Sequence, residues 1–181
     1  MGKIEKPKPV KLICGLLAAD ASWLEQSQEV LARKFGPLDR ESEVISFDFT
    51  SYYAKELGPD ILRQYVSFED LIDPGALASI KISTNRLEEE LSEDGLRKGN
   101  LDPGYLDLSK MVLATTKDAT YRVYLGEGIY AQSTLFYEKG IYRPWEWTYT
   151  DYRTETAIGF FNEVRRAYKV RLKTEDGKRE G

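Results

Sequence analysis

Charged and hydroxyl side chains that could bind a ligand or transfer a proton gather between Thr115 and Arg153. Lys117 and Asp118 place an ammonium beside a carboxylate, and Arg122 follows them closely. Arginine and lysine are the side chains that proteins use to bind phosphate and carboxylate groups. We therefore expect Lys117 and Arg122 to contact an anionic ligand, and Lys117 with Asp118 to be candidates for acid–base chemistry.

A β-hairpin is expected directly after this charged step. Tyr121–Leu125 and Ile129–Tyr137 alternate in polarity, and Gly126-Glu127-Gly128 between them is typical of a hairpin turn. One face of the hairpin is apolar and is expected to pack on the core. The opposite face carries Arg122, Tyr124, Tyr130, Gln132 and Thr134. Antiparallel sheets commonly have one solvated face, so this polar face is either an ordinary surface or the wall of a ligand site.

The segment from Arg143 to Arg153 is rich in aromatic and charged residues and suits neither a helix nor a strand. Its large aromatic side chains must be buried by the domain itself, by a partner or by a ligand. On the first alternative, Trp145 and Trp147 hold a loop against the core. On the second, the segment is an interaction surface for a partner or a second copy, since Trp, Tyr and Arg dominate such interfaces. On the third, it lines a pocket, and the candidate ligand contacts are Arg143, Trp147, Tyr152 and Arg153.

Two further acidic residues are candidates from outside this stretch. Asp48 ends an alternating segment on its polar face and joins Lys117 and Asp118 as a candidate catalytic group. Asp102 lies in Asn100–Gly104, whose residues are typical of a turn, and is a candidate ligand contact. Pairing Asp48 with Asp102 or Asp118 matches no known metal loop, so no metal site is predicted.

The composition excludes several kinds of chemistry. The 181 residues contain no histidine, which rules out His-based triads and His–metal catalysis. A general acid or base must then be Asp, Glu, Lys, Tyr or Cys with a shifted pKa. The single cysteine, Cys14, lies in an apolar run and is expected in the core. Phosphate-binding loops, dinucleotide-binding glycine motifs and the hydrolase nucleophile motif are all absent from the sequence.

The net charge of −4 argues against a nucleic-acid partner, because such proteins usually carry a basic surface. RNA binding through the aromatic hairpin stays a weak alternative. The basic N-terminus has no apolar stretch of the kind a signal peptide needs, and no segment is apolar for long enough to cross a membrane. We therefore expect a cytoplasmic protein with no membrane partner.

The first half of the chain predicts a strand–helix–strand–strand–helix order, as at the start of a ferredoxin-like fold. The expected elements are a strand at Val10–Leu17, a helix from Asp20 or Ser22 to Gly36-Pro37, strands at Glu43–Phe49 and Gln64–Phe68, and a helix from Asp73-Pro74 to near Gly95.

In the second half, we expect a fourth strand within Leu106–Ala114, then the hairpin, a short strand at Ile141–Arg143 and a helix capped by Thr154. The predicted fold class is α+β, with a mainly antiparallel sheet and helices packed on it. Residues 1–8 are expected to form a flexible arm, residues 9–172 a single domain and residues 173–181 a charged tail.

Several motifs together resemble the uncharacterised bacterial family described as domain of unknown function 4416. They are Phe47-Asp48-Phe49-Thr50-x-Tyr52-Tyr53, Asn100-Leu101-Asp102-Pro103-Gly104-Tyr105-Leu106, Ala114-Thr115-Thr116-Lys117-Asp118 and Trp147-Thr148-Tyr149-x-Asp151-Tyr152-Arg153. The resemblance covers nearly the whole chain but implies no established activity. Some members carry the label of GTP-binding protein, whereas this chain has neither a Walker lysine nor an N-K-x-D guanine motif.

The sequence therefore favours a small-molecule-binding domain that recognises a phosphorylated or other anionic ligand. It leaves open whether the domain is an enzyme, whether the ligand is a nucleotide, which cofactor it uses and whether it forms a homo-oligomer. The rival hypothesis is a protein-interaction module without catalysis that uses the 143–153 segment. The small-molecule hypothesis requires that Asp48, Asp102, Lys117, Arg122 and Arg153 converge in one cleft, whereas light scattering on the purified chain would test the interaction module.

Overall fold

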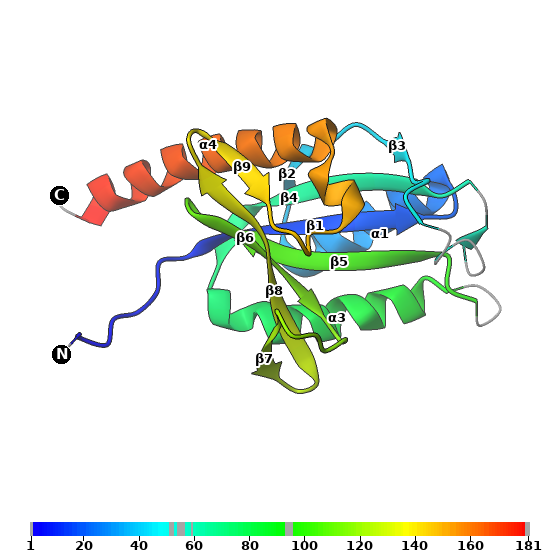
Figure 1. Ribbon diagram of the computed structural model, residues 1–181, viewed down its shortest axis with the longest axis horizontal. Helices are drawn as coiled ribbons and strands as arrows, with labels where there is room; N and C mark the ends of the chain where they lie inside the picture. The colour runs from blue at the N-terminus through cyan, green and yellow to red at the C-terminus, as the bar shows by residue number, and fades with distance from the viewer. Residues whose placement is uncertain (1, 51–52, 54–56, 59, 93–95, 180–181) are drawn as a thin grey trace.

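The computed structural model describes residues 2–50, 53, 57–58, 60–92 and 96–179 (Figure 1). Tyr52 of the first family motif, and most of the segment between Thr50 and Gly58, lie outside the described residues. Residues 2–9 have no regular structure and extend away from the body of the protein (Figure 1).

One antiparallel sheet of nine strands forms the centre of the described part of the chain. Its strands are β1 (Val10–Ala18), β2 (Leu38–Glu41), β3 (Ile45–Ser46), β4 (Leu62–Ile72), β5 (Gly99–Leu106), β6 (Lys110–Thr115), β7 (Val123–Gly126), β8 (Ile129–Glu138) and β9 (Ile141–Pro144). The α-helices are α1 (Ala21–Phe35), α3 (Leu77–Glu90) and α4 (Glu155–Arg179), with 3-10 turns η1 (Pro74–Ala76) and η2 (Thr150–Arg153). The predicted α+β class with a mainly antiparallel sheet is confirmed.

The strand order also confirms the ferredoxin-like start. The order runs β2-β4-β1-β5-β6-β8-β7, with β3 paired to β4 and β9 paired to β8. The first four of these are the strands of the split βαβ arrangement, in which β1 lies between β4 and β5. Every residue of β1 is buried, which explains its nearly continuous apolar sequence.

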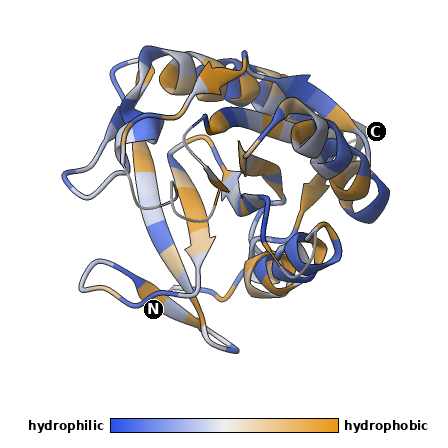
Figure 2. Cartoon of the chain, turned by 90° about the vertical axis from the view of Figure 1, so that its right-hand side faces the viewer, coloured by the Kyte–Doolittle hydropathy of each residue, from blue (hydrophilic) through white to orange (hydrophobic). Residues whose placement is uncertain are grey.

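Helices cover both faces of the sheet (Figure 1). α1 and α3 pack on one face, in a core that includes Leu12 and Leu16 of β1. α4 packs on the other face, in a core that includes Ile13 and Tyr65. Figure 2 looks onto the end of the molecule where β1 finishes, and it shows the mixed hydrophobic and hydrophilic sides of α3.

The predicted helix boundaries follow from capping groups. Asp20 Oδ1 accepts a hydrogen bond from Trp23 N at 2.9 Å, and α1 ends at Gly36 with φ 97°. Asp73 caps η1, which leads into α3. Thr154 Oγ1 accepts from Ala157 N at 3.2 Å at the start of α4. This last helix continues to Arg179, through most of the segment predicted as a charged tail.

Three strands differ from the expected positions. Of the predicted Glu43–Phe49 strand, Ile45–Ser46 forms β3, while Leu38–Glu41 forms β2 directly after the Gly36-Pro37 helix end. The predicted turn at Asn100–Gly104 is wrong, because these residues form most of β5. They are extended because β1 binds the whole strand on one side, from Ala18 opposite Gly99 to Lys11 opposite Leu106.

The prediction of an apolar hairpin face on the core holds for only part of the hairpin, since Ile129 and Leu135 of β8 are buried as expected. Val123 and Leu125 of β7 are exposed, whereas Gln132 and Thr134 of β8 are fully buried. The burial of Gln132 follows from an irregularity in the β6–β8 pairing, where Val112 pairs with Ser133 but Met111 pairs with Leu135. An extra residue in one strand reverses the faces of all residues beyond it. Gln132 therefore lies on the α4 face, opposite Leu113.

Candidate functional site

The sheet is split between β5 and β6. The two strands pair only at Gly104–Leu106, opposite Leu113–Met111. Pro103, which has no backbone N–H to donate, is the first residue of β5 beyond the paired stretch. The first half of β5 and the end of β6 therefore diverge. α3 contacts both strands at this opening.

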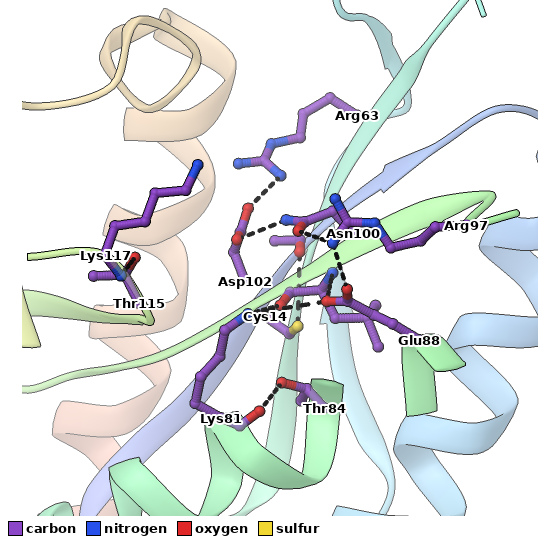
Figure 3. A network of polar contacts seen from close by, with 12 residues as sticks. Cys14, Arg63, Lys81, Thr84, Glu88, Arg97, Asn100, Asp102, Thr115 and Lys117 are labelled. Carbon is purple, nitrogen blue, oxygen red and sulfur yellow. Dashed lines mark hydrogen bonds and ion pairs between the residues drawn. The ribbon is translucent and has the colours of Figure 1, made fainter. Parts of the chain in front are cut away.

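Two side chains of α3 bind the strand edge that β6 leaves unpaired (Figure 3). Lys81 Nζ donates to Leu101 O at 2.8 Å, and Glu88 Oε1 accepts from Leu101 N at 2.8 Å. Both side chains are buried, and Arg97 NH1 donates to Glu88 Oε2 at 2.9 Å. Burial raises the pKa of Glu88, although Lys81, the Leu101 N–H and Arg97 act in the opposite direction. These residues replace backbone pairing that the sheet lacks at this point.

A cavity of about 910 Å³ lies at this split. Its walls bring together parts of the fold that are distant in sequence, among them Asn100 and Asp102 on β5, Thr115 and Lys117 at the end of β6, Gln132 on β8, and the segment from Glu146 to Tyr152. In Figure 3, Thr115 and Lys117 lie on one side of the opening, and Asn100 and Asp102 lie on the other. The volume is in the range of small-molecule and cofactor sites.

A buried arginine, Arg63 of β4, organises the inner wall. Its NH2 atom lies 2.6 Å from Asp151 Oδ2, and its NH1 atom lies 3.3 Å from Asp102 Oδ2. The guanidinium also lies 4.9 Å from the ring centre of Tyr65 and 4.8 Å from that of Tyr152. Burial alone would lower the pKa of Arg63, but Asp151 and the other neighbours raise it well above its ordinary value, so Arg63 stays charged. Gly15 makes room for this cluster, because a Cβ atom there would meet Tyr152 Oη.

Asp102 is held on the other side by Asn100, whose Nδ2 donates to Asp102 Oδ1 at 2.7 Å. The Asp102 side chain keeps 26% of its surface exposed and lines the cavity. It therefore presents a fixed carboxylate to whatever fills that space.

Tyrosines add hydrogen-bond donors to the walls. Burial raises the pKa of Tyr53, Tyr149 and Tyr152, and a nearby arginine partly opposes this, Arg63 for Tyr53 and Tyr152 and Arg122 for Tyr149. Asp102 is among the groups that raise all three. These phenols therefore stay protonated at neutral pH and act as donors rather than bases.

Arg122 forms the opposite wall and is fixed by three hydrogen bonds. Its Nε donates to Gln132 Oε1 at 2.9 Å, its NH1 to Lys117 O at 2.7 Å and its NH2 to Tyr149 Oη at 2.8 Å. All three acceptors are uncharged. Because a guanidinium only donates, the bond from Nε also fixes the orientation of the Gln132 amide. The amide nitrogen, Gln132 Nε2, is buried without a partner among the described groups.

The aromatic residues of the 143–153 segment stack on the same sheet. Trp147 lies between Tyr121 and Trp145, with ring centres 5.3 and 5.2 Å apart, and Trp145 contacts Phe136 at 4.3 Å. Both indole nitrogens donate to Ser133, Trp147 to its carbonyl at 2.8 Å and Trp145 to its hydroxyl at 3.2 Å. The segment therefore packs along β8, and one side of it borders the cavity.

The structure brings some of the sequence-predicted residues together and separates others. Asp102, Lys117, Arg122, Trp147 and Tyr152 line the cavity. The other candidates lie outside its lining: Asp48, Asp118, Tyr124, Tyr130, Thr134, Arg143 and Arg153. Of the five residues whose convergence was in question, three meet in the cavity and two, Asp48 and Arg153, do not.

The candidates outside the lining have other positions. Asp48 and Asp118 are exposed, and Tyr124 packs against Tyr130 near the hairpin tip. Thr134 is buried, and its carbonyl accepts a hydrogen bond from the Thr148 hydroxyl. Arg143 forms an exposed ion pair with Glu138. Arg153 donates from Nε to Thr148 O at 2.7 Å and so holds the aromatic segment in place.

Sequence reasoning missed several residues that build the cavity. The most important are Arg63, Lys81, Glu88, Arg97, Asn100 and Asp151. Arg63 is the one charged residue in Leu62–Phe68, and this was an available signal for it. Lys81 and Glu88 carried no signal, because helix periodicity does not reveal which polar side chains bind a strand edge.

Among the described residues, no three Asp, Glu or Cys side chains gather in a way that could hold a metal ion. The same part of the chain has no helix that is both long and apolar enough to span a bilayer.

Fold and site together define an α+β domain with a ferredoxin-like strand order, extended by a hairpin, and a polar cavity where its sheet splits. The chain belongs to the family described as domain of unknown function DUF4416, whose model matches residues 8–168. This confirms the resemblance seen in the sequence. Neither the curated proteins nor the solved structures include a match to this chain.

Proposed function

We propose that this protein binds an anionic small molecule in the cavity at the split between β5 and β6. The anionic group, a phosphoryl or carboxylate, would contact Arg122, with Lys117 beside it. This proposal keeps the ligand class expected from the sequence. It moves the binding site from the hairpin face to the cavity at the split between β5 and β6.

The observation that carries the proposal is the environment of Arg122. Its three hydrogen bonds go to an amide oxygen, a backbone carbonyl and a phenol, and none of these acceptors cancels its charge. A guanidinium has five N–H groups, so donors remain on NH1 and NH2 after these bonds. Arg122 is therefore a charged and pre-oriented donor in a cavity wall, which is the arrangement that favours an anion.

Arg63, Arg97 and Lys81 also line the cavity, but their contacts indicate a structural role rather than ligand binding. Arg63 contacts Asp102 and Asp151, while Arg97 and Lys81 contact Glu88. Their charges are largely balanced by these carboxylates, so they stabilise the walls. The Arg122 side differs from them because its fixed partners are neutral.

The proposal is tested by measuring ligand-induced stabilisation of the full-length chain. Wild-type protein is heated with inorganic phosphate, pyrophosphate, nucleotides, sugar phosphates and dicarboxylates, and hits are titrated by calorimetry. A ligand at a hundred times its Kd stabilises a protein by about 2.7 kcal/mol, which is readily seen as a rise in Tm. If no compound of the panel raises the Tm of the wild-type protein, the proposal is wrong.

A pair of matched variants locates the binding site. Arg122→Gln removes the cation from the cavity, and we expect it to weaken anion binding about tenfold or more. Arg143→Gln makes the same change at an exposed arginine that pairs with Glu138 outside the cavity, and should leave affinity unchanged. Equal losses in the two variants would show that the anion binds elsewhere or only through overall charge.

The alternative of an interaction module has less support. It requires the 143–153 segment to offer its aromatic side chains to a partner. Trp145 and Trp147 instead stack on each other and donate their indole N–H groups to Ser133 of the same chain. The nearby cavity offers a simpler reason for so many polar and aromatic groups at one place.

A further inference from the structure

We infer that the ligand carries hydroxyl groups at the end opposite its anionic group, as a sugar phosphate or polyol phosphate does, and that Asp102 binds them. This inference rests on the proposed function and specifies the ligand class of the same cavity. It depends on the contrast between the two walls, one built around Arg122 and the other around Asp102.

The Asp102 carboxylate can accept more hydrogen bonds than its protein partners donate. Its Oδ1 accepts from Asn100 Nδ2 at 2.7 Å, and its Oδ2 lies 3.3 Å from Arg63 NH1. A carboxylate offers about four lone-pair sites, so each oxygen can accept one further hydrogen bond. The exposed quarter of the side chain, 26%, borders the cavity, so those sites face the ligand space.

The same carboxylate determines the direction in which the ligand lies. A phosphoryl group placed beside Asp102 would meet a negative charge, whereas hydroxyl groups would donate to it. On the other wall, Arg122 NH1 and NH2 offer only donors and a positive charge. The ligand therefore binds favourably to both walls when its anionic group contacts Arg122 and its hydroxyl groups contact Asp102.

The size of the cavity supports a ligand with two such ends. Asp102 lies on β5, and Arg122 follows the end of β6 on the far side of the split. A cavity of about 910 Å³ is far larger than a lone phosphate ion needs, and it lies within the range of drug-sized ligand sites.

Tyr149 connects the two ends. Its phenol oxygen accepts from Arg122 NH2 at 2.8 Å, and Asp102 is among the groups that raise its pKa. The Tyr149 hydroxyl is thus protonated, close enough to both walls to respond to each, and available to donate to an oxygen-rich ligand.

The test uses pairs of phosphates that differ only in their hydroxyl groups. Glycerol 3-phosphate is compared with propyl phosphate, and with the corresponding methyl ether, which accepts hydrogen bonds but cannot donate them. Calorimetry on the full chain should show that the wild-type protein prefers glycerol 3-phosphate to both analogues by about tenfold, the gain typical of a hydrogen bond to a charged group. Ribose 5-phosphate and pentyl phosphate form a second pair.

Asp102→Asn should reduce this preference, measured as the ratio of the two dissociation constants within one protein. Arg122→Gln should weaken both members of each pair, and Arg143→Gln should change neither. Melting curves establish that each variant is folded. Should Asp102→Asn fail to fold, the methyl-ether comparison on the wild-type protein still tests whether the hydroxyls donate to an acceptor, and equal affinity for the two ligands overturns the inference.

The outcomes separate the inference from the proposal beneath it. If none of the phosphates binds, the proposed function fails and this inference fails with it. If alkyl and hydroxylated phosphates bind the wild-type protein equally, the anion site stands and the inference is overturned. A preference that Asp102→Asn leaves intact would also overturn it, since another group would then bind the hydroxyls.

Discussion

Arg63 and Asp151 form a buried ion pair between the sheet and the turn that precedes α4. The Arg63 NH2 atom lies 2.6 Å from Asp151 Oδ2, and the two side chains are only 2% and 7% exposed. The pair fixes η2, and with it the aromatic segment, against β4. Removing one partner of a buried pair leaves an uncompensated charge, which costs more than the pair itself contributes.

Asp151→Asn should therefore lower the free energy of unfolding by about 3 kcal/mol. Urea unfolding at neutral pH measures the change. Glu138→Gln is the control, because it breaks the exposed Arg143–Glu138 pair and should cost less than about 1 kcal/mol. Similar losses in the two variants would mean that Arg63 is adequately balanced by Asp102 alone.

Gly15 of β1 leaves the space that the Arg63 and Tyr152 side chains occupy. A Cβ atom at this position would meet Tyr152 Oη and would lie 3.1 Å from Arg63 NH1. Tyr152 cannot easily move, because its ring stacks on Phe161 at 5.9 Å. We expect Gly15→Ala to destabilise the protein by about 1–3 kcal/mol, the usual cost of overpacking.

Gly159 of α4 is the matched control for this substitution. A Cβ atom there has no neighbour within 4 Å. Because glycine is a poor helix former, Gly159→Ala should stabilise the protein by about 0.5–1 kcal/mol. Opposite signs for the two Gly→Ala changes in thermal unfolding are the expected result. A neutral Gly15→Ala would show that the cluster can shift.

The pattern of the sequence predicted the ferredoxin-like strand order because helix caps and apolar strands are local signals. Asp20, Asp73 and Thr154 act through groups only two or three residues away. β5 was missed for the opposite reason. Asn100 and Asp102 favour turns on their own, and they are held in a strand by Arg63, by each other and by the pairing with β1, none of which is visible locally.

In the candidate site too, local sequence patterns predicted some residues, whereas contacts between distant segments could not be predicted. Lys117 and Arg122 are close in sequence and were predicted together. Asp102 was predicted, but its partner Arg63 was not. The faces of β8 were misassigned because the irregular pairing between Val112–Ser133 and Met111–Leu135 reverses them. A bulge of this kind is set by the pairing of two strands, so the alternation of one strand cannot reveal it.

Glu88 should make the stability of the protein depend on pH. Burial raises its folded-state pKa above the ordinary value of 4.5. The folded state then holds this proton more tightly than the unfolded state, and stability falls as pH rises between the two pKa values. The stabilising effect of the proton is complete below pH 4.5 and is lost as pH rises through the folded-state pKa.

Glu88→Gln removes this proton but keeps an oxygen that can accept from the Leu101 N–H. Denaturant unfolding of both proteins from about pH 4 to pH 8 gives the stability difference at each pH. Relative to the variant, the wild-type protein should be most stable at the acidic end, and its advantage should shrink as pH rises and then level off. A difference that stays constant, or that grows with pH, would contradict the raised pKa.

Trp145 distinguishes packing from partner binding in the 143–153 segment. Its ring lies between Trp147 and Phe136, with ring centres 5.2 and 4.3 Å away, and its Nε1 donates to Ser133 Oγ at 3.2 Å. If Trp145 serves only to pack the segment, Trp145→Ala should lower the free energy of unfolding by about 2 kcal/mol. This is somewhat less than the loss expected on truncating a fully buried aromatic side chain. Tyr124→Ser is the control, because that side chain is 60% exposed and its loss should change the free energy of unfolding little.

Light scattering on the wild-type protein and both variants should give the same molar mass. A wild-type oligomer that Trp145→Ala separates into folded monomers would instead support the interaction module.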